Sequence, residues 1–155
     1  MNALAKKLGK RLKRRRAMLV TAESCTGGWV AQAVTAISGS SDWFERGFVT
    51  YSNAAKRELL GVKKRTLQKF GSVSEETARE MVKGALKKSR GTIAVAVTGV
   101  AGPTGGSARK PVGLVCFAFA TSRAVFSETR RFKGNRESVR RQSVVHALKG
   151  VLERG

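Results

Sequence analysis

The sequence predicts an α/β fold in which helices cover both faces of a mixed β-sheet, giving a three-layer α/β/α domain. The predicted element order is helix, strand, helix, strand, helices, three strands and a final helix. Residues 93–97 form a continuous apolar run, which is typical of a strand buried on both faces. Two further strand-like segments, 113–121 and 124–132, are joined so tightly that they must form an antiparallel hairpin.

The spacing of apolar residues, together with glycine and serine residues that end helices and strands, predicts the other elements. The first is a helix over 2–16, with Leu4, Leu8 and Leu12 as an apolar stripe that we expect to pack on the sheet. The segments that follow are a strand at 17–22, a helix at 26–37, a strand at 44–52, a short helix at 53–60 and a turn at 66–70. Ser74 is a predicted N-cap for the next helix, and the last helix spans about 136–153.

Length and composition predict one domain over residues 1–155, with a basic N-terminal helix at 1–16. No run approaches the roughly 20 apolar residues that cross a bilayer, so we expect no membrane insertion. The N-terminal segment carries eight Lys or Arg between residues 6 and 16 and has no apolar signal core. Only two cysteines, Cys25 and Cys116, are present. These features favour a cytoplasmic protein without disulfides.

The formal net charge of +21 has two interpretations. One is binding of nucleic acid through its phosphates, and the other is a generally basic, solvated surface. The charges are spread along most of the chain, and neither a zinc module nor the pattern of an RNA-binding sheet is present. We therefore expect weak, non-specific nucleic-acid binding rather than sequence recognition, and a field that attracts anionic small substrates.

Residues 21–28, Thr-Ala-Glu-Ser-Cys-Thr-Gly-Gly, follow a predicted strand and precede a predicted helix. Ser24 and Cys25 are two candidate nucleophiles in this turn, and backbone N–H groups at 25–27 could stabilise an oxyanion. A helix N-terminus would also lower the pKa of the Cys25 thiol. The competing interpretation is structural, with Ser24 or Thr26 acting only as the N-cap of the helix.

A serine nucleophile needs a base, and the chain has a single histidine, His146, amid apolar residues of the last helix. That count argues against a Ser-His-Asp triad and against a histidine-rich zinc site. Lys56 is the alternative base, because burial can bring the pKa of a lysine toward neutrality. Tyr51, at the preceding strand end, could relay a proton or hold the lysine. The competing interpretation makes Lys56 one more solvated lysine.

A second glycine-rich loop, 99–106, follows Thr98 at the end of the buried strand. Ligands of α/β sheets bind at such strand ends, so the loop could hold a phosphate or could be only a surface loop. Arg136 and Arg140 lie one helical turn apart near the start of the last helix. They could clamp a phosphate or carboxylate, or be two more surface arginines.

Several motifs together resemble the CinA C-terminal domain family. They occur in the family's order over about residues 17–150, so a chance match is excluded in practice. In this sequence they are residues 21–28 (TAESCTGG), 49–56 (VTYSNAAK), 60–62 (LGV), 71–75 (GSVSE), 98–103 (TGVAGP), 110–113 (KPVG) and 132–136 (FKGNR).

The resemblance implies hydrolysis of the carboxamide of nicotinamide mononucleotide to nicotinate mononucleotide and ammonia, in pyridine-nucleotide salvage. It implies Ser24 as nucleophile, Lys56 as its base and Tyr51 as a supporting residue, with no metal and no cofactor. Relatives also imply a homodimer or larger homo-oligomer. The expected substrate-binding residues are Cys25, Thr26, Gly27, Gly28, Asn53, Thr98, Gly99, Gly102, Arg136 and Arg140.

The chain departs from the family pattern at Asn135, where many relatives have aspartate before the arginine. If that aspartate orients the arginine, the contact is weaker here. The basic composition also keeps two rival hypotheses open. One is a catalytically inactive module that binds nucleotides or RNA, and the other is amide hydrolysis by Cys25.

Overall fold

The computed structural model describes residues 1–155, and its five strands form one sheet in the order β2-β1-β3-β4-β5. Strands β1, β2 and β3 are parallel, whereas β4 is antiparallel to β3 and β5 to β4. The predicted mixed sheet and the hairpin are therefore confirmed. The strands are β1 (Leu19–Glu23), β2 (Phe44–Val49), β3 (Ile93–Gly99), β4 (Leu114–Thr121) and β5 (Val125–Arg131).

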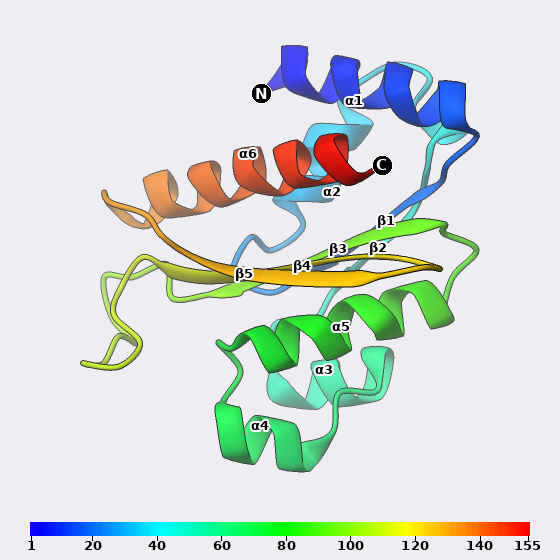
Figure 1. Cartoon of the computed structure of the whole chain (residues 1–155). Coiled ribbons are helices and arrows are strands. Elements are labelled where there is room, and N and C mark those ends of the chain that lie inside the picture. Colours follow the sequence, from blue (N-terminus) through cyan, green and yellow to red (C-terminus); the bar gives the residue numbers. More distant parts are fainter.

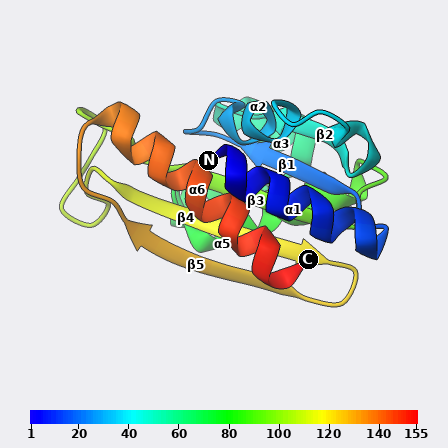
Figure 2. The ribbon, with the colours of Figure 1, turned by 90° about the horizontal axis from the view of Figure 1, so that it is seen from above.

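Helices cover both faces of this sheet, as predicted (Figure 1). One face carries α1 (Asn2–Arg15), α2 (Trp29–Thr35) and α6 (Arg136–Arg154), and α1 and α6 pack side by side (Figure 2). The other face carries α3 (Asn53–Leu60), α4 (Lys64–Phe70) and α5 (Glu75–Lys87). A short 3₁₀ turn, Ser40–Asp42, precedes β2. No helix is both long and apolar enough to cross a membrane.

The core consists of two apolar layers, one on each side of the sheet. Successive side chains of β3 alternate between them, with Val95 and Val97 toward α6 and Ala94 and Ala96 toward α5. Both sets are buried, which is why the strand reads as an uninterrupted apolar run. The leucine stripe of α1 packs into the first layer and leaves its lysines and arginines at the surface.

Several predicted boundaries differ from the structure, and three of them have clear local causes or change an element. Helix α2 begins at Trp29 rather than residue 26, because Gly27 and Gly28 have φ values of 60° and 97°, which a right-handed helix cannot contain. The strand predicted over 44–52 ends at Val49, where Thr50 turns the chain toward α3. The turn predicted at 66–70 is a helix that begins at Lys64.

The topology gathers most of the motif segments at one edge of the sheet. The parallel strands β1, β2 and β3 end there, β4 begins there, and β5 ends there before leading into α6. Strand β1 lies between β2 and β3. The connection from β1 leads to its neighbour on one side, β2, and the connection from β2 crosses back to its neighbour on the other side, β3. Ligands of α/β sheets bind at such switch points.

Candidate active site

Ser24 and Lys56, which are 32 residues apart in the sequence, are in direct contact. The Lys56 Nζ lies 3.0 Å from the Ser24 Oγ. Ser24 directly follows β1, and Lys56 lies in the first turn of α3, which follows β2. Because β1 and β2 are parallel neighbours, their carboxyl ends place the two side chains together. This arrangement pairs a hydroxyl nucleophile with a potential base at hydrogen-bond distance.

The Lys56 side chain is almost completely buried, with an exposed fraction of 1%. Its ammonium group donates hydrogen bonds to the carbonyl oxygens of Thr50 at 2.8 Å and Tyr51 at 3.0 Å. Burial disfavours the charged form and lowers the pKa of Lys56 to about 8. In the neutral amine, the two N–H bonds can serve the two carbonyls, which leaves the lone pair for the Ser24 hydroxyl. Lys56 is therefore not a solvated surface lysine.

Glu23 caps α2, a role that the sequence analysis did not assign to it. Its carboxylate accepts hydrogen bonds from the backbone N–H of Val30 at 2.8 Å and of Ala31 at 3.0 Å. A carboxylate at a helix N-terminus satisfies free N–H groups and complements the helix dipole. The alternative that Ser24 or Thr26 caps the helix is wrong, since the N-cap residue is Gly28 and no side chain of its own caps it. The sequence signal for this capping role was an acidic residue a few positions before a helix whose N-cap residue is a glycine.

Of the expected oxyanion donors at 25–27, only the Cys25 N–H is free and belongs to a residue that is not fully buried. The Gly27 N–H donates to the Ser24 carbonyl at 3.0 Å, and the Ser24 N–H donates to Val97 at 2.9 Å, so neither is free. The N–H groups of Cys25 and Thr26 have no hydrogen-bond acceptor in the fold. These donors lie in the turn before α2 rather than in its first turn, because the helix begins three residues later than Thr26.

The Cys25 thiol is poorly suited to act as a nucleophile. Its side chain is 6% exposed, and burial raises its pKa to about 12. The expectation that a helix N-terminus lowers this pKa is wrong, because α2 begins beyond Cys25 and Glu23 is its anionic neighbour. A thiol with such a pKa is almost entirely protonated at neutral pH and is a weak nucleophile.

Tyr51 contributes two different groups to the site. Its backbone carbonyl holds Lys56, whereas its phenol is exposed and accepts a hydrogen bond from Arg136 Nη2 at 3.4 Å. The phenol makes no hydrogen bond to Ser24 or Lys56, so the expected proton relay through Tyr51 has no support in this geometry. Arg136 also donates to the Gly102 carbonyl at 2.8 Å and thereby links α6 to the glycine-rich loop.

A pocket of about 320 Å³ surrounds Ser24 and Lys56. Its wall includes four other predicted positions, Cys25, Thr98, Gly99 and Gly102, with Tyr51 and Arg136 at the exposed side. The wall is completed by Ser72 and Val73, Val100 and Ala101, and Thr104 and Gly105. The sequence analysis included these positions in its motifs or its glycine-rich loop but did not name them individually as site residues. The Thr98 hydroxyl donates a hydrogen bond to the Ser72 carbonyl at 2.7 Å. This bond connects the end of β3 to the segment between α4 and α5.

Five predicted substrate-binding residues do not line this pocket: Thr26, Gly27, Gly28, Asn53 and Arg140. Asn53 begins α3 and is exposed to solvent. Arg140 is not a free phosphate clamp, because its guanidinium donates to the backbone carbonyls of Cys25 and Thr26. Asn135 caps α6 by accepting from the Ser138 N–H at 2.9 Å and has no hydrogen bond to Arg136.

His146 does not belong to the site. Its imidazole packs against Phe117 and Phe132 and lies 2.9 Å from a Glu128 carboxylate oxygen. These contacts make His146 a structural residue of α6. No group of three or more His, Cys, Asp or Glu side chains is arranged to hold a metal ion.

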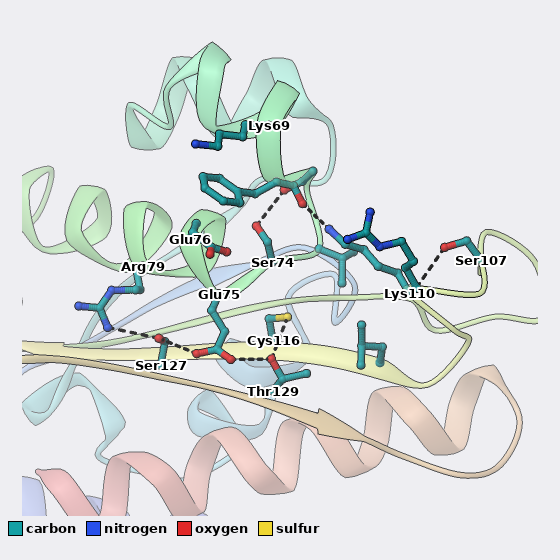
Figure 3. Close-up of a pocket in the computed structure, with 15 residues that line it drawn as sticks. Lys69, Ser74, Glu75, Glu76, Arg79, Ser107, Lys110, Cys116, Ser127 and Thr129 are labelled. Carbon is teal, nitrogen blue, oxygen red and sulfur yellow. Dashed lines mark hydrogen bonds between the residues drawn. The ribbon is translucent and has the colours of Figure 1, made fainter.

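A second and larger hollow lies between α5 and the β4–β5 hairpin (Figure 3). This α5 groove measures about 870 Å³ and carries Lys69, Arg79, Arg109 and Lys110 together with Glu75 and Glu76. Glu75 accepts hydrogen bonds from the Ser127 and Thr129 hydroxyls at 2.9 and 2.8 Å. The groove contains neither Ser24 nor Lys56.

Comparisons with known proteins identify relatives of this chain. The family model of the CinA C-terminal domain matches residues 1–154. A protein of Escherichia coli K12 named nicotinamide-nucleotide amidohydrolase PncC is 55% identical over 97% of this chain and 92% of its own length. A protein of the same name from Pseudomonas putida is 52% identical over 100% and 97%.

A solved structure has the same fold as this chain. The crystal structure of the competence/damage inducible protein CihA from Agrobacterium tumefaciens has a TM-score of 0.96 and 47% identity. The match covers 98% of this chain and 93% of that one. The nearly full-length match of the family model and the identity with these relatives lead to one conclusion: this chain belongs to the CinA C-terminal domain family.

Proposed function

We propose that this protein is a nicotinamide-nucleotide amidohydrolase that converts nicotinamide mononucleotide to nicotinate mononucleotide and ammonia by a Ser–Lys mechanism. The contact between Ser24 Oγ and the buried Lys56 amine carries the proposal. The substrate class comes from the relatives' name, nicotinamide-nucleotide amidohydrolase. Such a reaction returns the pyridine nucleotide to salvage as its acid form.

In the acylation step, the neutral Lys56 amine accepts the Ser24 proton while Oγ forms a bond to the carboxamide carbon. The carbonyl electron pair moves to oxygen, and the N–H of Cys25, a residue of the pocket wall, is the donor available for this oxyanion. When the oxyanion collapses, the C–N bond breaks. The Lys56 ammonium returns its proton to the leaving nitrogen, which departs as ammonia.

In the deacylation step, Lys56 is again neutral and accepts a proton from a water molecule that attacks the acyl-enzyme carbon. The tetrahedral intermediate collapses with cleavage of the bond to Ser24, whose oxygen takes the proton back from Lys56. The product is nicotinate mononucleotide, and the enzyme is restored. No group of the protein other than Ser24, Lys56 and the Cys25 N–H has to change its bonding in this scheme.

The rest of the substrate extends toward the open side of the pocket. Arg136 is the cationic side chain on the pocket wall besides Lys56, and we assign it to the 5′-phosphate. The Tyr51 phenol, which contacts Arg136, lies at the same mouth and is placed to contact the ribose. This assignment keeps the uncharged carboxamide, rather than the phosphate, next to Lys56.

The test is ammonia release from nicotinamide mononucleotide by the wild type and by Ser24→Ala and Cys25→Ala. We expect turnover in the wild type, loss of more than about 1,000-fold in Ser24→Ala, and a much smaller change in Cys25→Ala. Equal ammonia release by Ser24→Ala and wild type would refute the Ser24 mechanism. No turnover by the wild type, together with salt-dependent RNA binding, would favour the inactive binding module.

A further inference from the structure

Arg140 reaches from α6 to two successive carbonyls of the nucleophile turn. Its Nε donates to the Cys25 oxygen at 3.0 Å, and its Nη2 donates to the Thr26 oxygen at 3.1 Å. The guanidinium also lies 5.3 Å from the centre of the Trp29 ring, which begins α2. One side chain thus ties the last helix to the turn that carries Ser24, across 115 residues of sequence.

These contacts are not explained by substrate binding. Arg140 does not line the pocket around Ser24, and its donors are directed at backbone oxygens. A phosphate clamp needs donors that are free to face the ligand, and Arg136 is the arginine that lines the pocket.

We infer that Arg140 is a positioning residue that fixes the turn carrying Ser24 and the Cys25 N–H. A peptide unit is planar, so a donor fixed on its C=O fixes the orientation of the whole unit. Arg140 holds the two successive peptide units that begin at Cys25 and Thr26. It thereby fixes the backbone next to Ser24 and Cys25, which both line the pocket.

The local backbone explains why the turn needs a contact from another element to hold its conformation. Gly27 and Gly28 follow directly and have positive φ values, and glycine gives a turn wide conformational freedom. The Cys25 and Thr26 N–H groups have no acceptor in the fold that would hold them.

The inference predicts a specific kinetic signature, and it rests on the proposed amidase function. The contacts of Ser24 and the Cys25 N–H with the reacting carbon and oxygen are completed only in the transition state, so a displaced turn lowers kcat and leaves KM nearly unchanged. We expect Arg140→Met to lower kcat about 100-fold, which is the scale of losing one oxyanion donor. Arg140→Lys restores the charge but not the two-point fork, and we expect it to recover only part of kcat.

Arg141→Met is the matched control. Arg141 is the next residue of α6, has the same charge and lies 5.5 Å from the same Trp29 ring, but it donates to Glu137 and not to the turn. We expect its kcat to stay within about twofold of wild type, since an exposed ion pair contributes little. Thermal unfolding of each variant checks that the folded fraction at the assay temperature is unchanged.

Two results would overturn the inference. One is an Arg140→Met variant with wild-type kcat and a raised KM, which is the signature of a phosphate clamp. The other is an equal loss of kcat in Arg140→Met and Arg141→Met.

A second readout separates this inference from the proposed substrate. Ser24 can be labelled by a fluorophosphonate, with formation of an O–P bond and loss of fluoride, and the label located by mass spectrometry. This reaction also develops charge on an oxygen, so we expect its rate to fall in Arg140→Met and not in Arg141→Met. If the wild type is labelled but does not release ammonia, the substrate assignment fails while the role of Arg140 is still decided by the two labelling rates.

Discussion

The pocket around Ser24 and the α5 groove hold their charged groups in opposite ways. The groove is the larger, about 870 Å³ against about 320 Å³, and presents four cationic side chains. Those cations lie at an open surface. Arg79 donates a hydrogen bond to the Ser127 hydroxyl, and Lys110 donates one to the Phe70 carbonyl (Figure 3). The pocket has one buried amine, and that amine faces a hydroxyl nucleophile.

The comparison teaches that reactivity here follows from burial and not from the amount of charge. A solvated lysine keeps a pKa near 10.4 and is protonated at neutral pH. The burial of Lys56 lowers its pKa to about 8, so a useful fraction is neutral under ordinary conditions. The chain carries 31 lysines and arginines, and only the one that the sheet edge buries next to a serine becomes a candidate base.

The largest expected effect comes from removing the Lys56 amine. Lys56→Met keeps the length of the side chain but removes the base, and we expect kcat with nicotinamide mononucleotide to fall at least about 1,000-fold. Lys64→Met, at an exposed lysine, is the control and should behave as wild type. Retention of more than a tenth of the activity in Lys56→Met would show that the buried amine is not the base.

The pH dependence sharpens the same contrast. Lys56 acts only when neutral, so kcat/KM should rise about tenfold per pH unit below pH 8 and level off above it. The sign follows from the lowered pKa, because protonation below about 8 removes the lone pair that accepts the Ser24 proton. The measurement is kcat/KM from pH 6 to 10. A value of kcat/KM that stays constant from pH 6 to 10 would show that Lys56 is not the base.

A substitution of Glu23 tests whether its buried carboxylate, which caps α2, stabilises the fold around the pocket. Glu23→Gln leaves one acceptor oxygen for the two N–H groups of α2, so we expect a loss of about 1–3 kcal/mol in the free energy of unfolding. Each kcal/mol corresponds to about 2–4 °C in Tm for a chain of this size. The control is Glu137→Gln at an exposed ion pair, where we expect less than about 0.5 kcal/mol. Equal Tm values for both variants would contradict the capping role.

The smallest effect is expected in the α5 groove. Lys69→Ala combined with Arg109→Ala removes two of its cations without touching the pocket lining. We expect kcat/KM for nicotinamide mononucleotide to stay within about twofold at 0.15 M salt, where exposed charges are screened beyond about 8 Å. A loss of tenfold or more would mean that the groove takes part in substrate binding and that the contrast between the two regions is wrong.

Much of the fold could be predicted from local patterns, and the errors have local causes. The hairpin, the buried β3 strand and the helices on both faces follow from apolar periods and short connections. The start of α2 was misplaced because the dihedral angles of Gly27 and Gly28 are not visible in a pattern of apolar residues. Of the predicted site, Ser24, Lys56, Thr98 and Arg136 come together, whereas Asn53 faces solvent and Arg140 is bound to the backbone.

The sequence by itself determined the order of elements, the position of a nucleophile turn between a strand and a helix, and the absence of a well-placed histidine. Only the tertiary structure decided which lysine faces Ser24 and what its pKa is, because that depends on neighbours brought together by parallel strands. The same holds for Glu23 on α2 and for Arg140 on the turn. Burial and convergence are properties of the packed chain, and no local run of residues encodes them alone.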